Sequence, residues 1–309
     1  MVSFATTTVF GVDWVFLKPY IVLGLALGSV YALSGVGVVV LYQATGVLNL
    51  AFGAIGAAGA LITYYLINHT SWPHWIAYLA CVLFGAIVNV IYGVTLGPAF
   101  ARRDPLVKMM GTLALALILL GVMAWRAPAG GAFVRVLRLP TSDDRITLLG
   151  AVVTYTQVIA LVFAILLTIG TTAFLRLTKI GTAMRALASD REITATLGVP
   201  VRRVELAAWL GSGLVCGGAG LMLADLFTSL DYTALTFLVI SSLAAALIGR
   251  LSSLWVTLAG GLAVGFFQAV ATPYSSISSY RTAAPFVLAI VALLYLGRHR
   301  TVTISRTAG

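Results

Sequence analysis

The chain has 309 residues, of which 61% are hydrophobic and only 9% are charged. Soluble domains carry about 25% charged residues, so this composition excludes a soluble enzyme or a nucleic-acid-binding domain. Cys81 and Cys216 lie in apolar runs without metal-ligand spacing, which excludes a disulfide framework and a zinc site. The composition predicts an all-α polytopic membrane protein.

Apolar stretches long enough to cross a membrane follow one another along almost the whole chain, since a spanning helix needs about 20 apolar residues. They cover residues 19–42, 49–67, 75–98, 107–125, 154–175, 206–224, 234–249, 254–272 and 283–297. The link Gln43–Leu48 is short for a loop, so we expect one early segment to be re-entrant or broken. The stretch 234–249 is short for a full crossing. The pattern predicts about eight or nine transmembrane helices.

The positions of Lys and Arg predict the orientation, because cytoplasmic loops carry an excess of both. If residues 176–205 are cytoplasmic, most of the cations fall on that side. They are Arg102, Arg103, Lys108, Arg176, Lys179, Arg185, Arg191, Arg202, Arg203, Arg250, Arg298, Arg300 and Arg306. The other side holds Lys18, Arg126, Arg135, Arg138, Arg145 and Arg281. This distribution places the N-terminus outside and the C-terminus in the cytoplasm, and it explains the net charge of +10 without a nucleic-acid partner.

Two polar segments interrupt the spans. The extracytoplasmic loop 126–153 alternates apolar and polar residues, which predicts a small hairpin over the mouth of a pathway. In the cytoplasmic segment 176–205, Gly181–Ala188 has the spacing of a short helix. Ser189 followed by Glu192 has the capping-box pattern, and Asp190 adds negative charge at the positive end of the next helix.

Gly198 supplies a left-handed C-terminal residue and Pro200 prevents continuation, so the pattern predicts a second short helix over Asp190–Leu197. A helix of about two turns is marginal in water and therefore docks on another surface. Two interpretations remain: a connector at the lipid headgroups, or a contact site for a partner protein.

The segment 181–198 resembles the cytoplasmic coupling loop of ABC-importer permeases. The matching residues are Gly181, Ala183, Arg185, Ala186, Ala188, Asp190, Ala195, Leu197 and Gly198. The early segment resembles the LivH-type branched-chain amino-acid permeases at Gly46, Asn49, Leu50, Ala51 and Gly53. WLGSGLVCGGAGLML resembles the small-residue helix of the same family. The resemblance covers most of residues 20–297 and implies the ABC importer permease fold, with residues 1–309 as a single transmembrane permease domain.

The resemblance also implies partners: a second permease subunit, two cytoplasmic ABC ATPase subunits and an extracytoplasmic solute-binding protein, in the lipids of a bacterial plasma (inner) membrane. The chain has no G-x-x-x-x-G-K-[ST] phosphate loop, since none of Lys18, Lys108 and Lys179 follows a glycine. We therefore expect no cofactor on this chain, no catalytic residue, and ATP on the partner subunits. The implied function is import of branched-chain or other small amino acids by ATP-driven alternating access.

Two sets of residues are candidates for this function. Gly46, Asn49, Phe52 and Gly53 are the candidate substrate pathway, because intramembrane polar groups and broken helices commonly face a solute. Asn49 fits equally well as a helix cap. The candidate ATPase-coupling residues are Gly181, Arg185, Asp190, Glu192 and Gly198.

Three features leave alternatives open. Phe52 stands where many LivH-type chains have His or Gln, and Arg250 and Trp255 depart from the family's glycine-rich pattern. Related permeases carry urea, amides or sugars, so these solutes remain alternatives. A stand-alone secondary carrier or channel is a further alternative. A membrane-embedded enzyme ranks below both, because no metal-ligand set or nucleophile–base pair is present.

Overall fold

The computed structural model describes residues 8–9, 12–70, 72–100, 103–126, 135–142, 144–148, 151–227, 229–274, 278 and 280–297. The long helices are α1 (Trp14–Thr45), α2 (Phe52–Thr70), α3 (His74–Phe100), α4 (Pro105–Arg126), α5 (Tyr155–Leu177), α8 (Val201–Leu226), α11 (Leu254–Val270) and α13 (Ala284–Gly297). The short helices are α6 (Lys179–Ser189), α7 (Arg191–Thr196), α9 (Tyr232–Phe237) and α10 (Val239–Ile248), with 3-10 turns η1 (Pro140–Ser142) and η2 (Arg281–Ala283). Strand β1 (Thr8–Val9) pairs with β2 (Val12–Asp13), and β3 (Arg145–Leu148) pairs with β4 (Ala151–Thr154).

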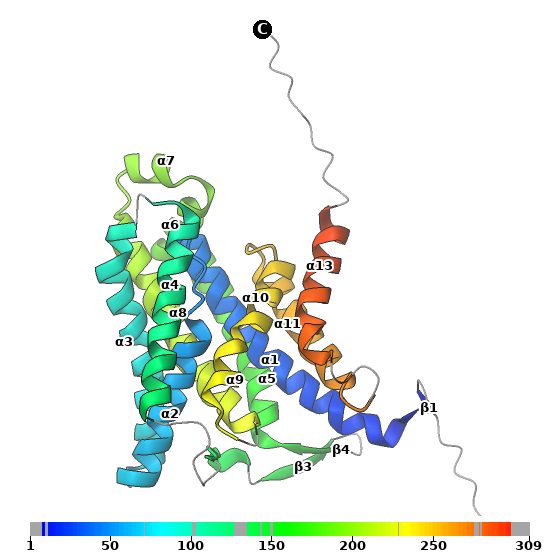
Figure 1. Ribbon diagram of the computed structural model, residues 1–309. Helices are drawn as coiled ribbons and strands as arrows, with labels where there is room; N and C mark the ends of the chain where they lie inside the picture. Colours follow the sequence, from blue (N-terminus) through cyan, green and yellow to red (C-terminus); the bar gives the residue numbers. More distant parts are fainter. Residues whose placement is uncertain are drawn as a thin grey trace, which may run out of the picture.

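The long helices form a bundle that runs between two ends of the molecule (Figure 1). Five helices in the described residues are long and apolar enough to cross a membrane, namely α1, α3, α4, α5 and α8. Shorter apolar helices cover Tyr232–Ile248, Leu254–Val270 and Arg281–Tyr295. The prediction of an all-α polytopic membrane protein with about eight or nine spans is confirmed.

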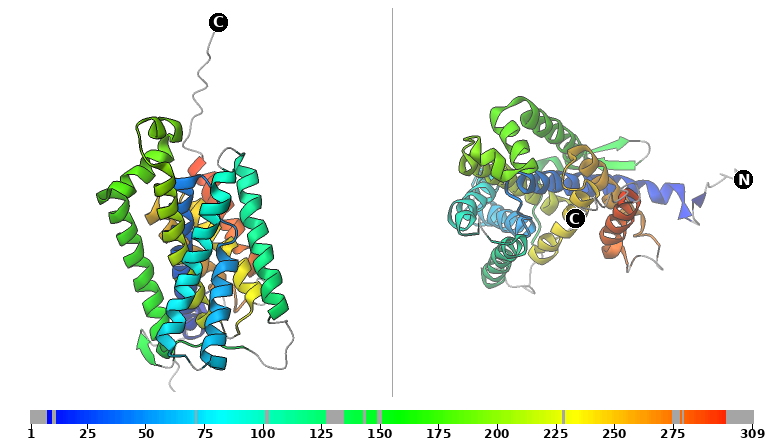
Figure 2. Two further views of the ribbon diagram at one scale, coloured as in Figure 1. Left: turned by 90° about the vertical axis from the view of Figure 1, so that its left-hand side faces the viewer. Right: turned by 90° about the horizontal axis from the view of Figure 1, so that it is seen from above.

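Helix α1 lies in the middle of the bundle (Figure 2). Many of its side chains, among them Val30, Leu33 and Val38, are completely buried. In contrast, α3 and α4 present exposed apolar side chains such as Ile87 and Ile118 on the outside. An apolar outer surface suits contact with lipid tails, in which such side chains need no cover.

Helices α1 and α11 approach closely because glycines face each other. A Cβ atom on Gly265 would lie 2.3 Å from the Cα atom of Gly28. Small residues of this kind let helix backbones meet where the lipid supplies no hydrophobic driving force. Gly28 and Gly265 therefore serve helix packing at this crossing.

Gly265→Ala is expected to destabilise the chain by about 1–3 kcal/mol, because the added methyl meets backbone that moves only with the whole helix. Thermal unfolding of the detergent-solubilised protein measures this effect. Gly218→Ala is the matched control, since a Cβ atom there meets nothing within 4 Å. Equal melting temperatures for the two variants contradict the close-packing account.

Two interruptions break the helical course. The chain leaves the helix after Thr45 and re-enters it only at Phe52, with Gly46 in the left-handed region at φ +69°. This confirms the expectation of a broken early segment. The predicted span 234–249 is two short helices, α9 and α10, which meet at Leu238. Both breaks lie inside the bundle and bring backbone groups to its interior.

The two ends of the bundle differ. Helices α6 and α7 lie at one end, which we call the α6–α7 end, and the β3–β4 hairpin lies at the other, the hairpin end (Figure 1). In the hairpin Arg145 pairs with Thr154 and Leu148 with Ala151, so the hairpin predicted in the loop 126–153 is present. Asp225 at the end of α8 accepts a hydrogen bond from the Leu139 amide at 2.7 Å, which fastens this loop to the bundle.

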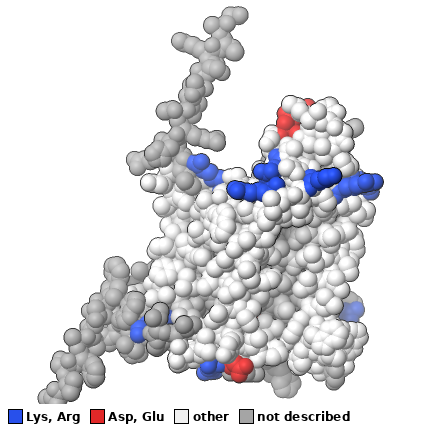
Figure 3. Space-filling view, turned by 180° about the vertical axis from the view of Figure 1, so that it is seen from behind, with Lys and Arg blue, Asp and Glu red and all other residues white. Residues whose placement is uncertain are grey.

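Lys and Arg gather around the base of α6 and α7 (Figure 3). Arg103 and Lys108 lie at the α3–α4 link, Arg250 lies in the α10–α11 link, and further cations lie in or beside α6 and α7. Arg102, Arg298, Arg300 and Arg306, which also contribute to the predicted asymmetry, lie outside the described residues. The described cations thus follow the grouping that the sequence predicts.

Candidate functional site

Helix α6 turns sharply away from α5. The Thr178 hydroxyl accepts a hydrogen bond from the Gly181 amide at 3.0 Å and so caps α6. A Cβ atom on Gly181 would lie 2.2 Å from the Phe174 carbonyl oxygen, so the corner between the two helices requires glycine. Met184 is buried against the bundle, whereas the Arg185 side chain is exposed.

The predicted capping box at Ser189 is wrong. Ser189 is the last residue of α6, and its hydroxyl donates to the Arg185 carbonyl at 3.3 Å. Asp190 takes the extended conformation of an N-cap, with φ −152° and ψ 113°, and accepts from the Ile193 amide at 2.9 Å. Because the cap lies one residue later, Glu192 is the second residue of α7 and cannot close the reciprocal bond of a capping box. The second helix runs over Arg191–Thr196.

Helix α7 ends as predicted and exposes apolar side chains. Gly198 has φ +83°, and its amide donates to the Ala195 carbonyl at 3.1 Å. Ile193 and Leu197 are 60% and 78% exposed although both are large and apolar. Exposed apolar side chains on a short capped helix that projects from the bundle are typical of a protein contact site.

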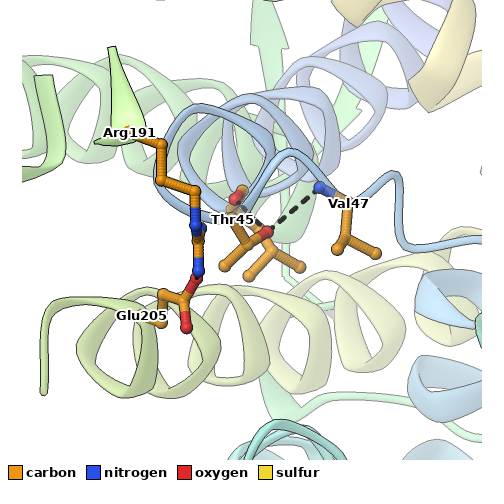
Figure 4. A network of polar contacts seen from close by, with 5 residues as sticks. Thr45, Val47, Arg191 and Glu205 are labelled. Atoms are coloured by element: carbon orange, nitrogen blue, oxygen red, sulfur yellow. Dashed lines mark hydrogen bonds and ion pairs between the residues drawn. The ribbon is translucent and has the colours of Figure 1, made fainter. Parts of the chain in front are cut away.

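A salt bridge fixes the start of α7 to α8. The Arg191 guanidinium lies 2.5 Å from the Glu205 carboxylate. Close to this pair, the Thr45 hydroxyl accepts from the Val47 amide at 3.2 Å and donates to the Leu41 carbonyl at 2.7 Å (Figure 4). One small cavity of about 20 Å³ is lined by Thr45, Val47, Arg191 and Glu205 among others, so the start of α7 lies close to the break between α1 and α2.

Asn49 lies in that break and is only 1% exposed. Its Oδ1 atom accepts from the Ala51 amide at 3.0 Å, and its Nδ2 atom donates to Asn89 Oδ1 at 2.9 Å. Asn89 in turn donates to the Gly85 carbonyl at 2.9 Å. The side chain therefore has the hydrogen bonding of a cap and in addition joins the break to α3.

Asn49→Leu is expected to destabilise the chain by about 1–3 kcal/mol for each buried polar atom that loses its partner. Asn89→Leu removes the same side-chain bond, so the double variant is expected to cost less than the sum of the two single variants. Thermal unfolding of the three purified variants measures the difference. Strict additivity contradicts a coupled Asn49–Asn89 pair.

Phe52 and Gly53 begin α2 and line a narrow cleft against α8 and α9. A Cβ atom on Gly53 would lie 2.2 Å from the Thr236 carbonyl oxygen. The cleft holds about 10 Å³, which is room for about one water molecule. The cleft is therefore too narrow for a small organic molecule.

A larger cavity of about 540 Å³ opens among α1, α9–α10, α11 and α13. We call it the outer cavity. Leu238 lines both the outer cavity and the narrow cleft. Its volume lies within the range of about 300–1,000 Å³ that is typical of small-molecule sites.

The wall of the outer cavity is mainly apolar with a few polar groups. The apolar part includes Leu23, Leu27, Phe237 and Phe286, and the polar part consists of Tyr31, Ser241, Gln268, Thr272, Arg281 and Thr282. The Tyr31 hydroxyl donates to Gln268 Oε1 at 2.9 Å, so this hydrogen bond joins α1 to α11. Arg281 is the one charged residue that lines the cavity, and among the described residues it has no salt bridge.

Sequence reasoning missed Tyr31, Ser241 and Arg281 as members of a site. For Tyr31 and Ser241, the available signal was a polar side chain within an apolar span. For Arg281 it was the single charge in the link between α11 and α13. The predicted residues Gly46, Asn49, Phe52 and Gly53 lie at or directly after the break, and none of them lines the outer cavity.

Spanning helices with internal breaks, a cavity near the break and a projecting helical element define a membrane transport component. Comparison of sequences gives the family: the profile described as "Branched-chain amino acid transport system / permease component" matches residues 20–296. The chain therefore belongs to this family, and with its apolar helices it is a multi-pass protein of the inner membrane.

Individual relatives agree with the family. The probable branched-chain amino acid transport permease protein LivH of Methanocaldococcus jannaschii is 27% identical over 254 residues, which cover 80% of this chain and 78% of that protein. The high-affinity branched-chain amino acid transport system permease protein LivH of Salmonella typhimurium is 22% identical, over 88% of this chain and 91% of that protein. The permease protein BraD of Pseudomonas aeruginosa is 24% identical over the same shares.

Proposed function

We propose that this chain is the transmembrane permease subunit of an ABC importer for branched-chain or other small apolar amino acids. The projecting α7, with exposed Ile193 and Leu197, is the observation that carries the proposal, because a self-contained carrier has no need of such a contact site. The printed names of the relatives support the solute class. The neutral solutes urea, amides and sugars are the alternative.

The charges support the proposed orientation. By the positive-inside rule, the cations around α6 and α7 favour a cytoplasmic position for that end, with the N-terminus outside. In this orientation the outer cavity, with Arg281 of η2 among its lining residues, receives solute from the extracytoplasmic side. The solute-binding protein delivers it there.

ATP drives the movement but binds to other chains. Two cytoplasmic ABC ATPase subunits contact α7 of this chain and of a second permease subunit. This chain holds no cofactor and catalyses no reaction itself. Gly181, Arg185, Asp190, Glu192 and Gly198 belong to the coupling element. Gly181 sets the corner, Asp190 and Gly198 define the ends of α7, and Glu192 faces the partner. Arg185 lies on α6, where it lines a cavity between this helix and the bundle.

Alternating access proceeds through the break. Closure of the ATPase subunits moves α7, and the Arg191–Glu205 salt bridge transmits the movement to α8 and to the α1–α2 break beside it. Separation of α2 from α9 then opens the cleft at Phe52 and Gly53. Asn49 holds the broken backbone in place on the side of α3, so its role is positioning.

Purification of the native complex with mass spectrometry of its subunits tests this proposal. A tagged version of this chain is expected to recover a second permease subunit and an ATPase subunit that contains a phosphate loop. The triple substitution of Ile193, Thr196 and Leu197 by serine provides the matched control, and it is expected to lose the ATPase but keep the second permease. Recovery of this chain without any ATPase contradicts the proposal.

A further inference from the structure

A second cavity lies at the α6–α7 end, away from the solute pathway. It holds about 400 Å³ and is lined by residues of α1, α5, α6, the α10–α11 link and α11. Its lining residues are Gln43, Thr172, Leu175, Arg176, Arg185, Ala188, Ser252, Ser253, Leu254 and Trp255. We call it the inner cavity.

The charged side chains that line the inner cavity are all positive. Arg176 and Arg185 come from different helices and line the same space, and no Asp or Glu is among the lining residues. The only salt bridge within the described part of the chain joins Arg191 to Glu205, so neither guanidinium is neutralised there. Two cations that converge on one cavity without a carboxylate favour an anionic ligand, for which arginine is the most suitable side chain.

The start of α11 borders the inner cavity. The Ser252 hydroxyl donates to the Gly249 carbonyl at 3.3 Å, and Ser253 caps α11. Gln43 Nε2 donates to the Ser252 carbonyl at 2.8 Å, which holds this link against the end of α1. Leu254 and Trp255, the first two residues of α11, line the same cavity as the two arginines, and a helix N-terminus favours negative charge.

The position of the inner cavity selects the kind of anion. Trp255 is 49% exposed at the cavity, and tryptophan is enriched at the boundary between lipid tails and water. Lys and Arg at the α6–α7 end lie in one band across the bundle (Figure 3). Basic pockets between spanning helices at this boundary bind phosphate-bearing lipid headgroups.

We propose that the inner cavity binds the phosphate of an anionic phospholipid, held by Arg176 and Arg185 with Trp255 against the upper acyl chain. Arg185 belongs to α6, which carries α7, so the bound lipid fixes the position of the coupling element relative to α5 and α11. The site depends on neither the solute nor the ATPase subunits.

Quenching of tryptophan fluorescence tests the proposal with the full chain in lipid vesicles. The vesicles contain phosphatidylcholine, with brominated phosphatidylglycerol or brominated phosphatidylcholine as quencher, and the Trp255 signal is the difference between the chain and its Trp255→Phe variant. We expect Trp255 to show about a tenfold preference for phosphatidylglycerol. Arg176→Gln with Arg185→Gln is expected to remove the preference.

Arg202→Gln with Arg203→Gln is the matched control, because these arginines are exposed at the same end but do not line the cavity. This variant is expected to keep the preference. Inorganic phosphate at millimolar concentration separates a lipid from a soluble anion and is expected not to displace the quencher. Three results overturn the proposal. They are equal quenching of Trp255 by both lipids in the unaltered chain, displacement of the brominated lipid by inorganic phosphate, and an equal loss of the lipid preference in the two double arginine variants.

Discussion

Replacing Ile193 and Leu197 together with aspartate is expected to reduce amino-acid uptake by about a hundredfold, because buried apolar anchors carry most of the energy of a protein contact. Both side chains are exposed in the isolated chain, at 60% and 78%. The loss of this apolar surface therefore costs the permease little stability. Uptake of radiolabelled leucine by cells that contain all subunits measures the effect.

Thr196→Asp is the control for charge alone, since it adds a carboxylate to the same helix without removing apolar surface. It is expected to retain most of the uptake. Immunoblots of the membrane fraction establish that all variants insert equally. ATPase activity in purified complexes is expected to become independent of solute-loaded binding protein in the double variant. Normal uptake by that variant refutes the assignment of α7 as the coupling helix.

Arg281→Gln is expected to lower the initial rate of leucine uptake at subsaturating leucine by about tenfold, the effect of losing one charge-assisted contact of ~1.4 kcal/mol with the solute carboxylate. Arg281 is the charged member of the wall of the outer cavity. Arg281→Lys is expected to retain most of the rate because the charge remains. Initial-rate uptake in cells with the complete transporter measures both variants.

Arg126→Gln is the matched control for Arg281. Arg126 lies at the end of α4 with its guanidinium 4.7 Å from the centre of the Trp125 ring, and it does not line the outer cavity. Unchanged uptake in this control shows that uptake depends on Arg281 in the outer cavity and not on any positive charge at the same side of the protein. Normal leucine uptake by Arg281→Gln indicates instead a neutral solute or a different entry route.

The sequence predicts the spans well because apolar length and charge are local properties. The end of α7 was predictable for the same reason: glycine at a left-handed position is a local requirement, and Gly198 meets it with φ +83°. The start was not, because Ser189 and Asp190 are both good caps. Only the packing of α6, which extends through Ser189, selects Asp190.

The larger failures concern contacts between distant segments. Asn49 and Asn89 are joined by a hydrogen bond, but nothing in the sequence pairs a residue of the early break with one on α3. The outer cavity likewise combines Tyr31 with Arg281 from opposite ends of the chain. Arg250 and Leu251 adopt φ 53° and 54°, which non-glycine residues rarely do. Gln43 holds this turn through the carbonyls of Leu251 and Ser252.

Reconstitution in liposomes tests the central claim, that this chain moves solute only when ATPase subunits act on α7. Purified chain alone is compared with the complete transporter, each with external solute-loaded binding protein and with or without internal ATP. We expect accumulation of labelled leucine only for the complete transporter with ATP. Uptake by the chain alone, or by the complete transporter without ATP, contradicts the account and identifies a stand-alone carrier or channel.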